Sequence, residues 1–216
     1  MEFERLIELV GDESIFETGL LLAGKVNPDL IHQQLTRWTK SGRVYQLRRG
    51  LYAIAPPYQK VKPHPFLVAN RIQRASYVSG PSALAFYGLI PEFVPITFSI
   101  TAGRPGRWET PIGVFVFRHV MPELLQGYRL SSLSGTQSDQ QALVATPEKA
   151  LLDLIYLQPG GDAPEYLSEL RLQNLERLDL DELRRQAEIF DSQKLHRVAE
   201  ATIHLAQVEI QEYETL

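Results

Sequence analysis

The stretch that decides the fold runs from residue 27 to residue 54 and has the sequence NPDLIHQQLTRWTKSGRVYQLRRGLYAI. It opens with Asn27-Pro28-Asp29, in which asparagine can cap free backbone N–H groups, proline fits the first helical position and aspartate offsets the positive end of the helix dipole. The predicted helix continues to about Lys40 and stops at the glycine that follows. Two β-prone runs, 44–47 and 51–54, then flank a glycine-containing turn. The stretch therefore predicts a helix followed by a hairpin.

Two more helices are predicted before this stretch. The first, over 3–10, has apolar residues at the i, i+3, i+4 and i+7 positions of one buried face, and Gly11 ends it. The second is expected to begin at Ser14 as its N-cap, to continue through Phe16 to Leu21, and to close at Gly24. Three short helices followed by a hairpin are typical of a winged helix-turn-helix domain.

The segment from Pro56 to Pro65 is rich in proline and is the best candidate for a domain boundary. The predicted fold class is α+β: an N-terminal winged helix-turn-helix domain over 1–56, then a larger mixed α/β domain over 66–216 that ends in a helical tail. Within the second domain we predict helices at 66–72, 81–87 and 146–157, strands at 77–79, 96–101, 114–120 and 143–145, and a glycine- and proline-rich connection at 102–113.

The tail after residue 161 is predicted to be helical and acidic. Asp179 and Glu182 have the spacing of a capping box. A buried stripe is expected along the last helix, formed by Leu195, Val198, Ala199 and Leu205.

Composition excludes several classes of protein. The chain has no cysteine, so disulfides, thiolate zinc sites and cysteine nucleophiles are ruled out. Apolar runs such as 20–23 are far shorter than a membrane span, and the acidic start lacks the features of a signal peptide, so a cytoplasmic protein without membrane contact is expected. The five histidines show no metal-ligand spacing, and no P-loop, dinucleotide fingerprint or nucleophile elbow is present. We therefore predict neither a cofactor nor an enzyme.

The distribution of charge is more informative than the net charge of −4. Between Lys25 and Lys62 there are eight basic residues and one acid, Asp29, giving 8 − 1 = +7, so the remainder carries −4 − 7 = −11. A basic block on an acidic body suits a module that meets phosphate while the rest of the chain stays soluble.

The helix over 28–40 has two faces at 100° per residue. One is expected to be buried and contains Leu30, Ile31, Leu35 and Trp38; the other contains His32, Gln33, Thr36, Arg37 and Lys40. Glutamine can pair with adenine, arginine with guanine and threonine with a thymine methyl, so the second face suits the major groove of DNA. The candidate DNA-binding residues are Gln33, Thr36, Arg37 and Lys40, which would read or border bases, and Arg43, Arg48 and Arg49, which would hold the phosphate backbone from the hairpin. The alternatives are an ordinary amphipathic surface helix and a charged strand edge that blocks aggregation.

In the second domain the helix starting at Pro147 raises a separate question. Leu151 and Leu154 are expected in the core, and Glu148 and Lys149 are expected to be exposed in its first turn. Asp153 lies among leucines and is expected either to pair with a buried cation or to face water. Two further arginines, Arg104 and Arg107, form either a second basic patch for nucleic acid or part of a solvated loop.

Three segments carry a resemblance to a known family. Residues 42–53 resemble the wing of the AbiEi-type antitoxins and related regulators, and residues 77–89 and 145–153 are similar to parts of that family's second domain. The segments occur in the same order and cover about 27–157, whereas the tail after Gly161 matches nothing in the family. The resemblance implies an antitoxin of a toxin–antitoxin or phage-defence system. Its winged helix would repress its own promoter at inverted repeats of double-stranded DNA, and its second domain would counter a nucleotidyltransferase-like toxin.

Three other interpretations remain open at this point. The chain can be a stand-alone transcription factor whose second domain senses a ligand or a protein partner. It can be an accessory that targets a nuclease or nucleotidyltransferase, or a protein-interaction module that uses the winged helix for docking. Salt-dependent binding to DNA separates the last of these from the others, because phosphate binding must release counterions.

Overall fold

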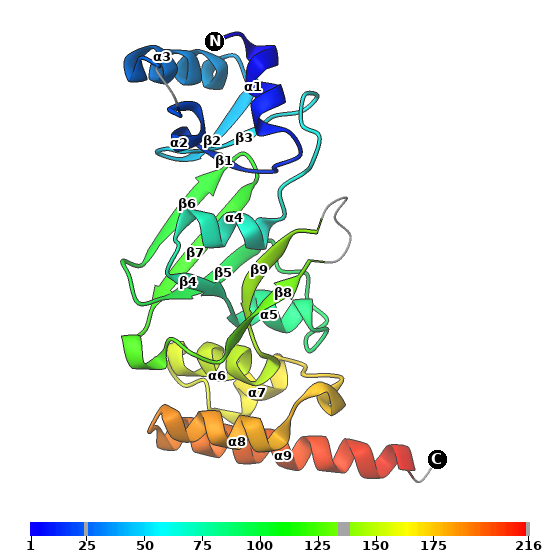
Figure 1. Ribbon diagram of the computed structural model, residues 1–216. Coiled ribbons are helices and arrows are strands. Elements are labelled where there is room, and N and C mark those ends of the chain that lie inside the picture. The colour runs from blue at the N-terminus through cyan, green and yellow to red at the C-terminus, as the bar shows by residue number, and fades with distance from the viewer. Residues whose placement is uncertain (24–25, 134–138, 215–216) are drawn as a thin grey trace.

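The computed structural model describes residues 1–23, 26–133 and 139–214, and the side chains of 209–214 are not described. The protein is a mixed α+β protein in three tiers (Figure 1). A small N-terminal unit lies at one end, a six-stranded sheet lies in the middle, and a layer of helices that includes the last one lies at the other end.

The N-terminal unit contains three helices and a small antiparallel sheet. Its elements are α1 (Phe3–Val10), β1 (Phe16–Glu17), α2 (Thr18–Leu21), α3 (Pro28–Lys40), β2 (Val44–Arg48) and β3 (Leu51–Ile54), and the strand order is β1-β3-β2. The predicted helix starting at Asn27 is confirmed, and the side-chain oxygen of Asn27 accepts a hydrogen bond of 2.9 Å from the backbone of Asp29. The predicted end of the first helix at Gly11 is also confirmed.

The predicted second helix is wrong over its first half. Phe16 lies in the short strand β1, where it pairs with Tyr52, and the two rings stack with their centroids 5.7 Å apart. Pairing with a strand far along the chain outweighs the local helical pattern, because it buries the phenylalanine. Only Thr18–Leu21 is helical, and the predicted stop at Gly24 lies outside the described residues.

The hairpin of β2 and β3 belongs to two hydrophobic cores. Val44, Tyr52 and Ile54 pack with the apolar faces of α1 and α3 in a small N-terminal core. Leu47, Leu51 and Ala53 instead join the large core that fills the rest of the molecule. All four residues of β3 are buried, so this strand is covered on both faces.

The central sheet has the order β6-β7-β5-β4-β9-β8. Its strands are β4 (Ser76–Val78), β5 (Ile96–Thr101), β6 (Gly106–Thr110), β7 (Gly113–His119), β8 (Tyr128–Ser132) and β9 (Gln141–Ala145). The pairs β5–β7 and β4–β9 are parallel, and the other pairs are antiparallel. The predicted strands near 77, 96, 114 and 143 are confirmed.

Two strands of the central sheet were not predicted from the sequence. The connection at 102–113 contains β6, whose Trp108 packs edge-on against Phe117 of β7 with ring centroids 5.0 Å apart. That tertiary contact anchors a strand in a segment whose glycines and prolines favour a loop. The other is β8, an edge strand whose residues are mostly exposed and which therefore lacks a buried stripe.

Helices cover the sheet and extend from it. They are α4 (Pro65–Ile72), α5 (Gly80–Phe86), α6 (Pro147–Leu157), α7 (Pro164–Glu169), α8 (Leu180–Ile189) and α9 (Gln193–Glu214), with short 3-10 turns η1 (Pro122–Leu124) and η2 (Leu175–Arg177). The α4 helix packs on β4 and β9, and its Asn70 joins the two strands by accepting a hydrogen bond of 2.6 Å from the backbone of Leu143 and donating to the Ser76 carbonyl. The α5 and α6 helices pack together, and α8 and α9 pack beneath α6 (Figure 1).

The predictions for the tail are partly confirmed. Asp179 caps α8 by accepting a hydrogen bond of 3.0 Å from the backbone of Glu182. On α9, Leu195 and Val198 are buried as predicted, but Leu205 is 53% exposed, and Ile203 continues the buried stripe instead. No helix among the described residues is long and apolar enough to cross a membrane.

Candidate nucleic-acid interface

The α3 helix is fixed to the N-terminal unit by a narrow apolar stripe. Ile31, Leu35 and Trp38 are buried, and the indole ring of Trp38 lies 5.6 Å from the ring of Phe3 on α1. The prediction that Leu30 is buried with them is wrong, because Leu30 is 56% exposed. It lies about 100° around the helix from Ile31, beyond the edge of the buried stripe. Three buried side chains therefore set the orientation of the helix.

The opposite face of α3 is polar and exposed, as predicted. Gln33, Thr36 and Lys40 lie near its centre, and Arg37 lies to one side of them. The Thr36 hydroxyl donates a hydrogen bond of 2.8 Å to the His32 carbonyl. Its proton is therefore used within the helix, and the methyl group and the acceptor lone pairs remain for an external contact.

The cations of this face are not neutralised within the described part of the chain. Neither Arg37 nor Lys40 forms an ion pair there. Asp29 is the acid that the helical spacing places on the same face, one turn or more from both. The face thus presents amide, hydroxyl, guanidinium and ammonium groups to solvent.

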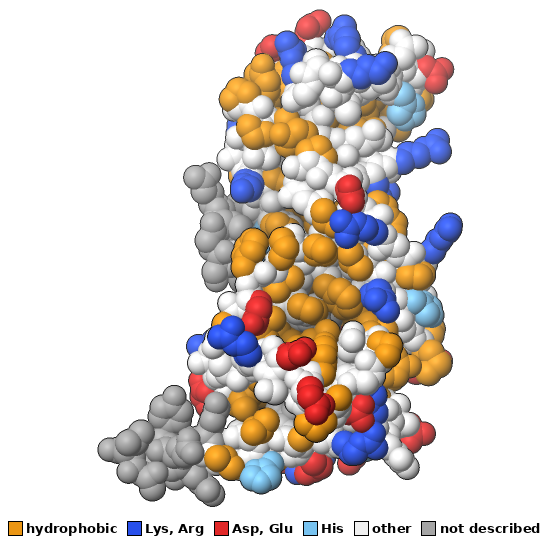
Figure 2. All heavy atoms as spheres, turned by 180° about the vertical axis from the view of Figure 1, so that it is seen from behind, with side chains coloured by type: hydrophobic (Ala, Val, Ile, Leu, Met, Phe, Trp, Pro, Cys, Tyr) orange, Lys and Arg blue, Asp and Glu red, His pale blue; other side chains and the backbone are white. Residues whose placement is uncertain are grey.

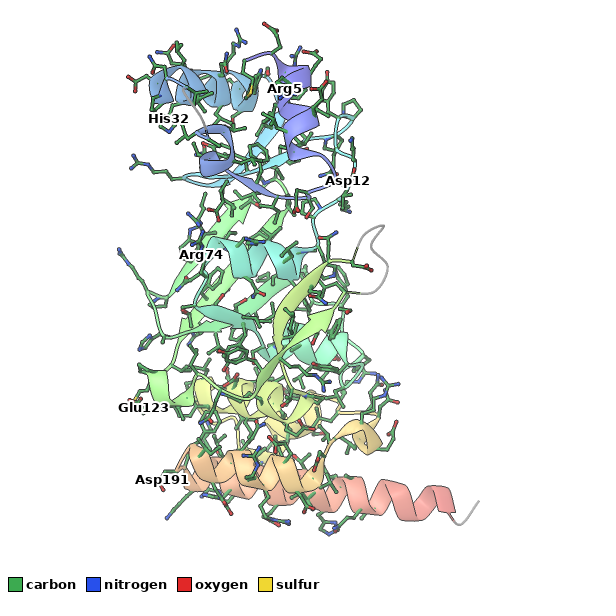
Figure 3. All side chains as sticks on the ribbon, viewed as in Figure 1. Arg5, Asp12, His32, Arg74, Glu123 and Asp191 are labelled. Carbon is green, nitrogen blue, oxygen red and sulfur yellow. The ribbon has the colours of Figure 1, made fainter. Side chains whose placement is uncertain are left out.

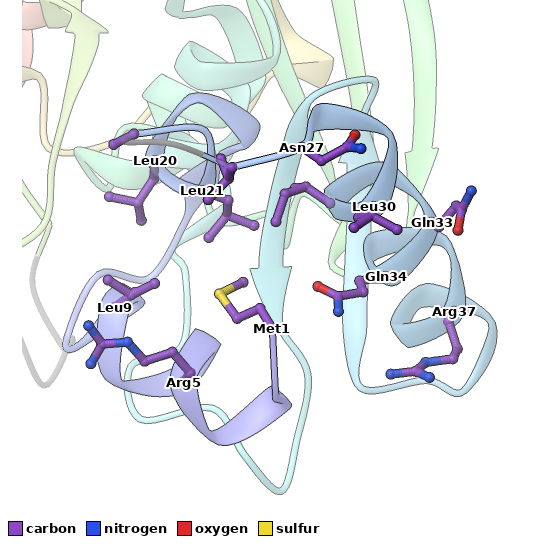
Figure 4. Close-up of a pocket in the computed structure, with 13 residues that line it drawn as sticks. Met1, Arg5, Leu9, Leu20, Leu21, Asn27, Leu30, Gln33, Gln34 and Arg37 are labelled. Atoms are coloured by element: carbon purple, nitrogen blue, oxygen red, sulfur yellow. The ribbon is translucent and has the colours of Figure 1, made fainter.

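A groove of about 760 Å³ runs along one flank of α3, between it and the two shorter helices, and Gln33 of the polar face is among its lining residues (Figure 4). Leu9 of α1, Leu20 of α2 and Leu30 of α3 line it and are each partly exposed. Arg5 and Arg37 line the groove from its two sides. An apolar surface therefore adjoins the polar face of the helix, a feature that the sequence pattern did not reveal because Leu30 was assigned to the core.

The three hairpin arginines, which the sequence assigned together to the phosphate backbone, lie at two separate places. Arg43 and Arg48 stand at opposite ends of β2, a separation of about 16 Å for a five-residue strand. The guanidinium of Arg43 lies over the ring of Phe3, 5.1 Å from its centroid. At the other end, Arg48 donates a hydrogen bond of 3.3 Å to the Arg71 carbonyl at the end of α4, and Arg49 is exposed. Another basic residue of the predicted block, Lys25, lies outside the described residues.

The second predicted basic pair is also divided. Arg104 is exposed in the loop after β5, and its carbonyl accepts a hydrogen bond of 3.3 Å from Gln73. Arg107 lies on β6 and pairs with Glu109 at 3.0 Å. Sequence reasoning missed Arg74, which follows α4 and, like Arg48, lies near Glu17; the signal for it was a second arginine three residues after Arg71.

A second cluster of ionisable groups is buried between the sheet and α6. Lys149 and Asp153, one turn apart on α6, are 1% and 0% exposed and form an ion pair. The Asp153 carboxylate also accepts hydrogen bonds from the hydroxyls of Tyr77, at 3.0 Å, and Ser79, at 2.7 Å. Of the two expectations for Asp153, the buried cation is confirmed.

The expected exposure of Glu148 and Lys149 is wrong. Glu148 is buried because its carboxylate accepts a hydrogen bond of 2.8 Å from the backbone of Asp179, which ties α6 to the start of α8. Lys149 is covered by Phe190, and its ammonium lies 4.4 Å from the centroid of that ring. Helices that pack over the first turn of α6 follow it in the chain, so the local sequence gave no sign of this cover.

Burial dominates the electrostatics of this cluster. It raises the pKa of the Asp153 carboxyl and lowers that of the Lys149 ammonium, and the attraction between the two groups opposes both shifts. Burial, followed by the charge of Asp153, raises the pKa of the Tyr77 hydroxyl. The adjoining cavity is about 10 Å³, close to the least that one water molecule requires. The groups contact one another, so the cluster joins β4 to α6.

Among the described residues no group of three or more histidine, aspartate or glutamate side chains is placed to hold a metal ion. No protein-family model matches the chain, and no curated protein matches its sequence. The geometry and charge of the described residues therefore carry the functional argument.

Proposed function

We propose that this chain is a cytoplasmic transcriptional regulator whose first 56 residues form a winged helix-turn-helix domain and whose α3 helix enters the major groove of duplex DNA. The observation that carries the proposal is the outer face of α3. It is polar, exposed and free of internal ion pairs among the described residues, and the three buried side chains opposite hold it rigidly. A reading helix needs both properties, because base contacts require side chains in fixed positions.

The polar residues of α3 divide into readers and supports. Gln33 has the amide that can pair with the N6 and N7 groups of adenine, and Arg37 has the fork that suits guanine. Thr36 offers its methyl group to thymine, because its proton is bound to the backbone. Lys40, at the C-terminal end of the helix, borders the bases, and Arg43, Arg48 and Arg49 hold the phosphate backbone.

The exposed Leu30 adds an apolar element beside these groups. It lines the groove together with Gln33, about one turn further along α3, and Arg37, about two turns further along. An apolar side chain next to a reading glutamine favours a thymine methyl at the neighbouring base pair. We therefore expect an operator in which A·T pairs face the N-terminal half of α3.

The test is a salt-series titration of the purified protein with the DNA upstream of its own gene and with a mixed-sequence duplex. The proposal expects tighter binding to the upstream DNA and a steep loss of affinity as salt rises. Gln33→Ala should lower the preference for the upstream DNA by about 1–3 kcal/mol. Gln46→Ala, which removes an exposed glutamine from β2, is the control and should leave the preference unchanged. Equal binding to both duplexes at every salt concentration would contradict the proposal.

We further propose, from the resemblance to AbiEi-type antitoxins, that the regulated promoter is the chain's own, that the operator contains inverted repeats, and that the larger unit counters a nucleotidyltransferase-like toxin of the same operon. The proposed protein is a binding protein without an enzymatic activity of its own. Co-expression with a neighbouring toxin gene tests this part: rescue of growth is expected, and it should persist in the Gln33→Ala variant. Failure to rescue, with DNA binding intact, would leave only the regulator.

One observation favours a second candidate, a stand-alone transcription factor that senses a ligand. The larger unit has a groove of about 570 Å³ lined by aromatic and proline side chains, including Phe66, Phe86 and Phe93. Figure 2 shows apolar side chains gathered across this middle part of the molecule, and Phe93 is 89% exposed. A sensor would bind promoter DNA with an affinity that a small apolar effector changes, and it would not rescue cells from a toxin.

A further inference from the structure

Five arginines from three separate segments meet along one edge of the molecule. We name them the edge strip: Arg48, Arg49, Arg71, Arg74 and Arg104. They come from the hairpin turn, the end of α4 and the loop between β5 and β6. Because these segments are far apart in sequence, the strip is a product of the fold.

Hydrogen bonds bring the three segments together. Arg48 donates to the Arg71 carbonyl at 3.3 Å, and the carbonyl of Arg104 accepts a hydrogen bond of 3.3 Å from Gln73, which lies between Arg71 and Arg74. The Glu17 carboxylate accepts two hydrogen bonds from Arg74, at 2.8 and 2.9 Å. These bonds lower the pKa of Glu17, and the nearby charges of Arg48 and Arg71 lower it further. The N-terminal unit and the larger unit therefore both contribute to the strip.

The strip is strongly positive for its size. Among the described residues, Glu17 is the one carboxylate that pairs with any of the five arginines. The net charge of the five arginines and Glu17 together is therefore 5 − 1 = +4. Bringing like charges together costs free energy, and exposure to water lowers the cost without removing it. Even the paired Arg74 has a side chain that is 72% exposed. A polyanion that contacts the strip offsets this repulsion.

In the view of Figure 3, His32 of α3 and Arg74, which follows α4, both lie toward the same edge of the molecule. Arginine also suits phosphate better than lysine does, because its planar fork donates two parallel hydrogen bonds. Within the strip the cations follow one another from the hairpin to the sheet, as they would beside one strand of a duplex.

We infer that the edge strip is a second DNA contact, which holds the phosphate backbone of duplex DNA outside the segment that α3 reads. This inference rests on the proposed function, because it takes the duplex bound by α3 as the partner. It assigns the larger unit a direct part in DNA binding and enlarges the footprint of one protein molecule. It also gives Arg48 and Arg49 partners in Arg71, Arg74 and Arg104, where the sequence had grouped them with Arg43.

The test compares three double variants of the full-length protein on a mixed-sequence duplex of about 30 base pairs, with salt varied from 50 to 200 mM. Arg71→Gln with Arg104→Gln weakens the strip, and Arg37→Gln with Lys40→Gln weakens α3. The control is Arg129→Gln with Arg171→Gln, which removes the same charge from exposed positions on β8 and after α7. Circular dichroism checks that each variant is folded.

The strip variant should lower the slope of log K against log salt by about 1.8, that is 0.9 for each lost phosphate contact. Between 50 and 200 mM salt, this makes its loss of affinity about twelvefold smaller than that of the wild type. The control should change little beyond the general effect of net charge. A slope equal to that of the control would overturn the inference, and a reduced slope in the α3 variant would show that the proposed function still holds.

Two other outcomes separate the two proposals further. A reduced slope in the strip variant together with an unchanged α3 variant would support the strip as a DNA contact and remove α3 as the reading helix. Binding of polyglutamate but not of the duplex, lost in the strip variant, would overturn the inference and assign the strip to an acidic protein.

Discussion

Replacing Lys149 with methionine tests the buried cluster beneath β4. Methionine keeps most of the side-chain stem but leaves Asp153 in a fully buried site without its cation. Removing one partner of a buried ion pair costs about 3–5 kcal/mol, because the remaining charge is uncompensated. The two hydroxyl donors, Tyr77 and Ser79, still contact the carboxylate and place the expected loss of unfolding free energy near the lower end of that range, at about 3 kcal/mol.

Urea denaturation followed by circular dichroism measures this loss. Lys60→Met is the matched control, because Lys60 pairs with Asp12 at 3.6 Å on the surface, where such a pair is worth about 1 kcal/mol or less. The variant should also depend on pH. Burial already raises the pKa of Asp153, and the loss of the ammonium raises it further.

The sign of that pH dependence follows from proton binding. The folded variant holds a proton on Asp153 at pH values where the unfolded chain has lost it, so folding is favoured in acid and weakened as pH rises. The deficit relative to wild type should therefore be smaller at pH 5 than at pH 8. A deficit below about 1 kcal/mol, or one that is equal at both pH values, would refute the account of a buried, desolvated ion pair.

Two further predictions concern single residues. The Nδ1 atom of His64 caps α4 by accepting a hydrogen bond of 3.1 Å from the backbone N–H of Phe66, and burial lowers the pKa of the imidazole. As pH falls, the histidine of the unfolded chain therefore takes up a proton before that of the folded chain does. The free energy of unfolding should fall as pH drops below about 6.5. His64→Asn keeps a cap and should remove that dependence, whereas His64→Ala should cost about 0.5–2 kcal/mol at neutral pH; an unchanged pH profile in His64→Asn would exclude this histidine as the cause. Gly80 has φ of 51°, and an added Cβ would lie 2.9 Å from the ring of Phe98, so Gly80→Ala should cost about 2–5 kcal/mol in thermal or urea unfolding. Gly42→Ala, with φ of 70° and open space around it, should cost only about 1–2 kcal/mol, and equal losses at the two positions would contradict a steric origin.

The parts of the fold that the sequence predicted well depend on neighbouring residues. Asn27, Thr146 and Asp179 cap helices where their spacing predicted helix starts. The exposed face of α3 also follows from spacing alone, since a helix turns by 100° per residue. Local rules of this kind need no knowledge of what packs against the element.

The parts that the sequence did not predict depend on contacts between distant residues. Phe16 is in a strand because Tyr52 lies beside it, and β6 forms where Trp108 meets Phe117. Lys149 is buried by Phe190, which follows it by about 40 residues. In each case the local sequence pattern predicted a different secondary structure or exposure, and a contact with a distant residue determined the one observed.

The candidate site shows the same division. The polar face of α3 lies on one helix and could be predicted, whereas the edge strip requires the hairpin, α4 and the β5–β6 loop to be placed together. Leu30 is the residue of this helix for which the pattern failed. Its hydrophobicity assigned it to the core, but in the structure it is exposed and lines a groove.

The hairpin has a consequence for anyone who wishes to transplant the N-terminal unit into another protein. A fragment that ends at Ala55 would carry Leu47, Leu51 and Ala53 on a face that the rest of the chain normally covers. Such a fragment would present an apolar strand surface to solvent and is expected to aggregate or to associate with itself. A usable excised unit would need polar replacements at Leu47 and Leu51, because a cut after the hairpin divides a hydrophobic core.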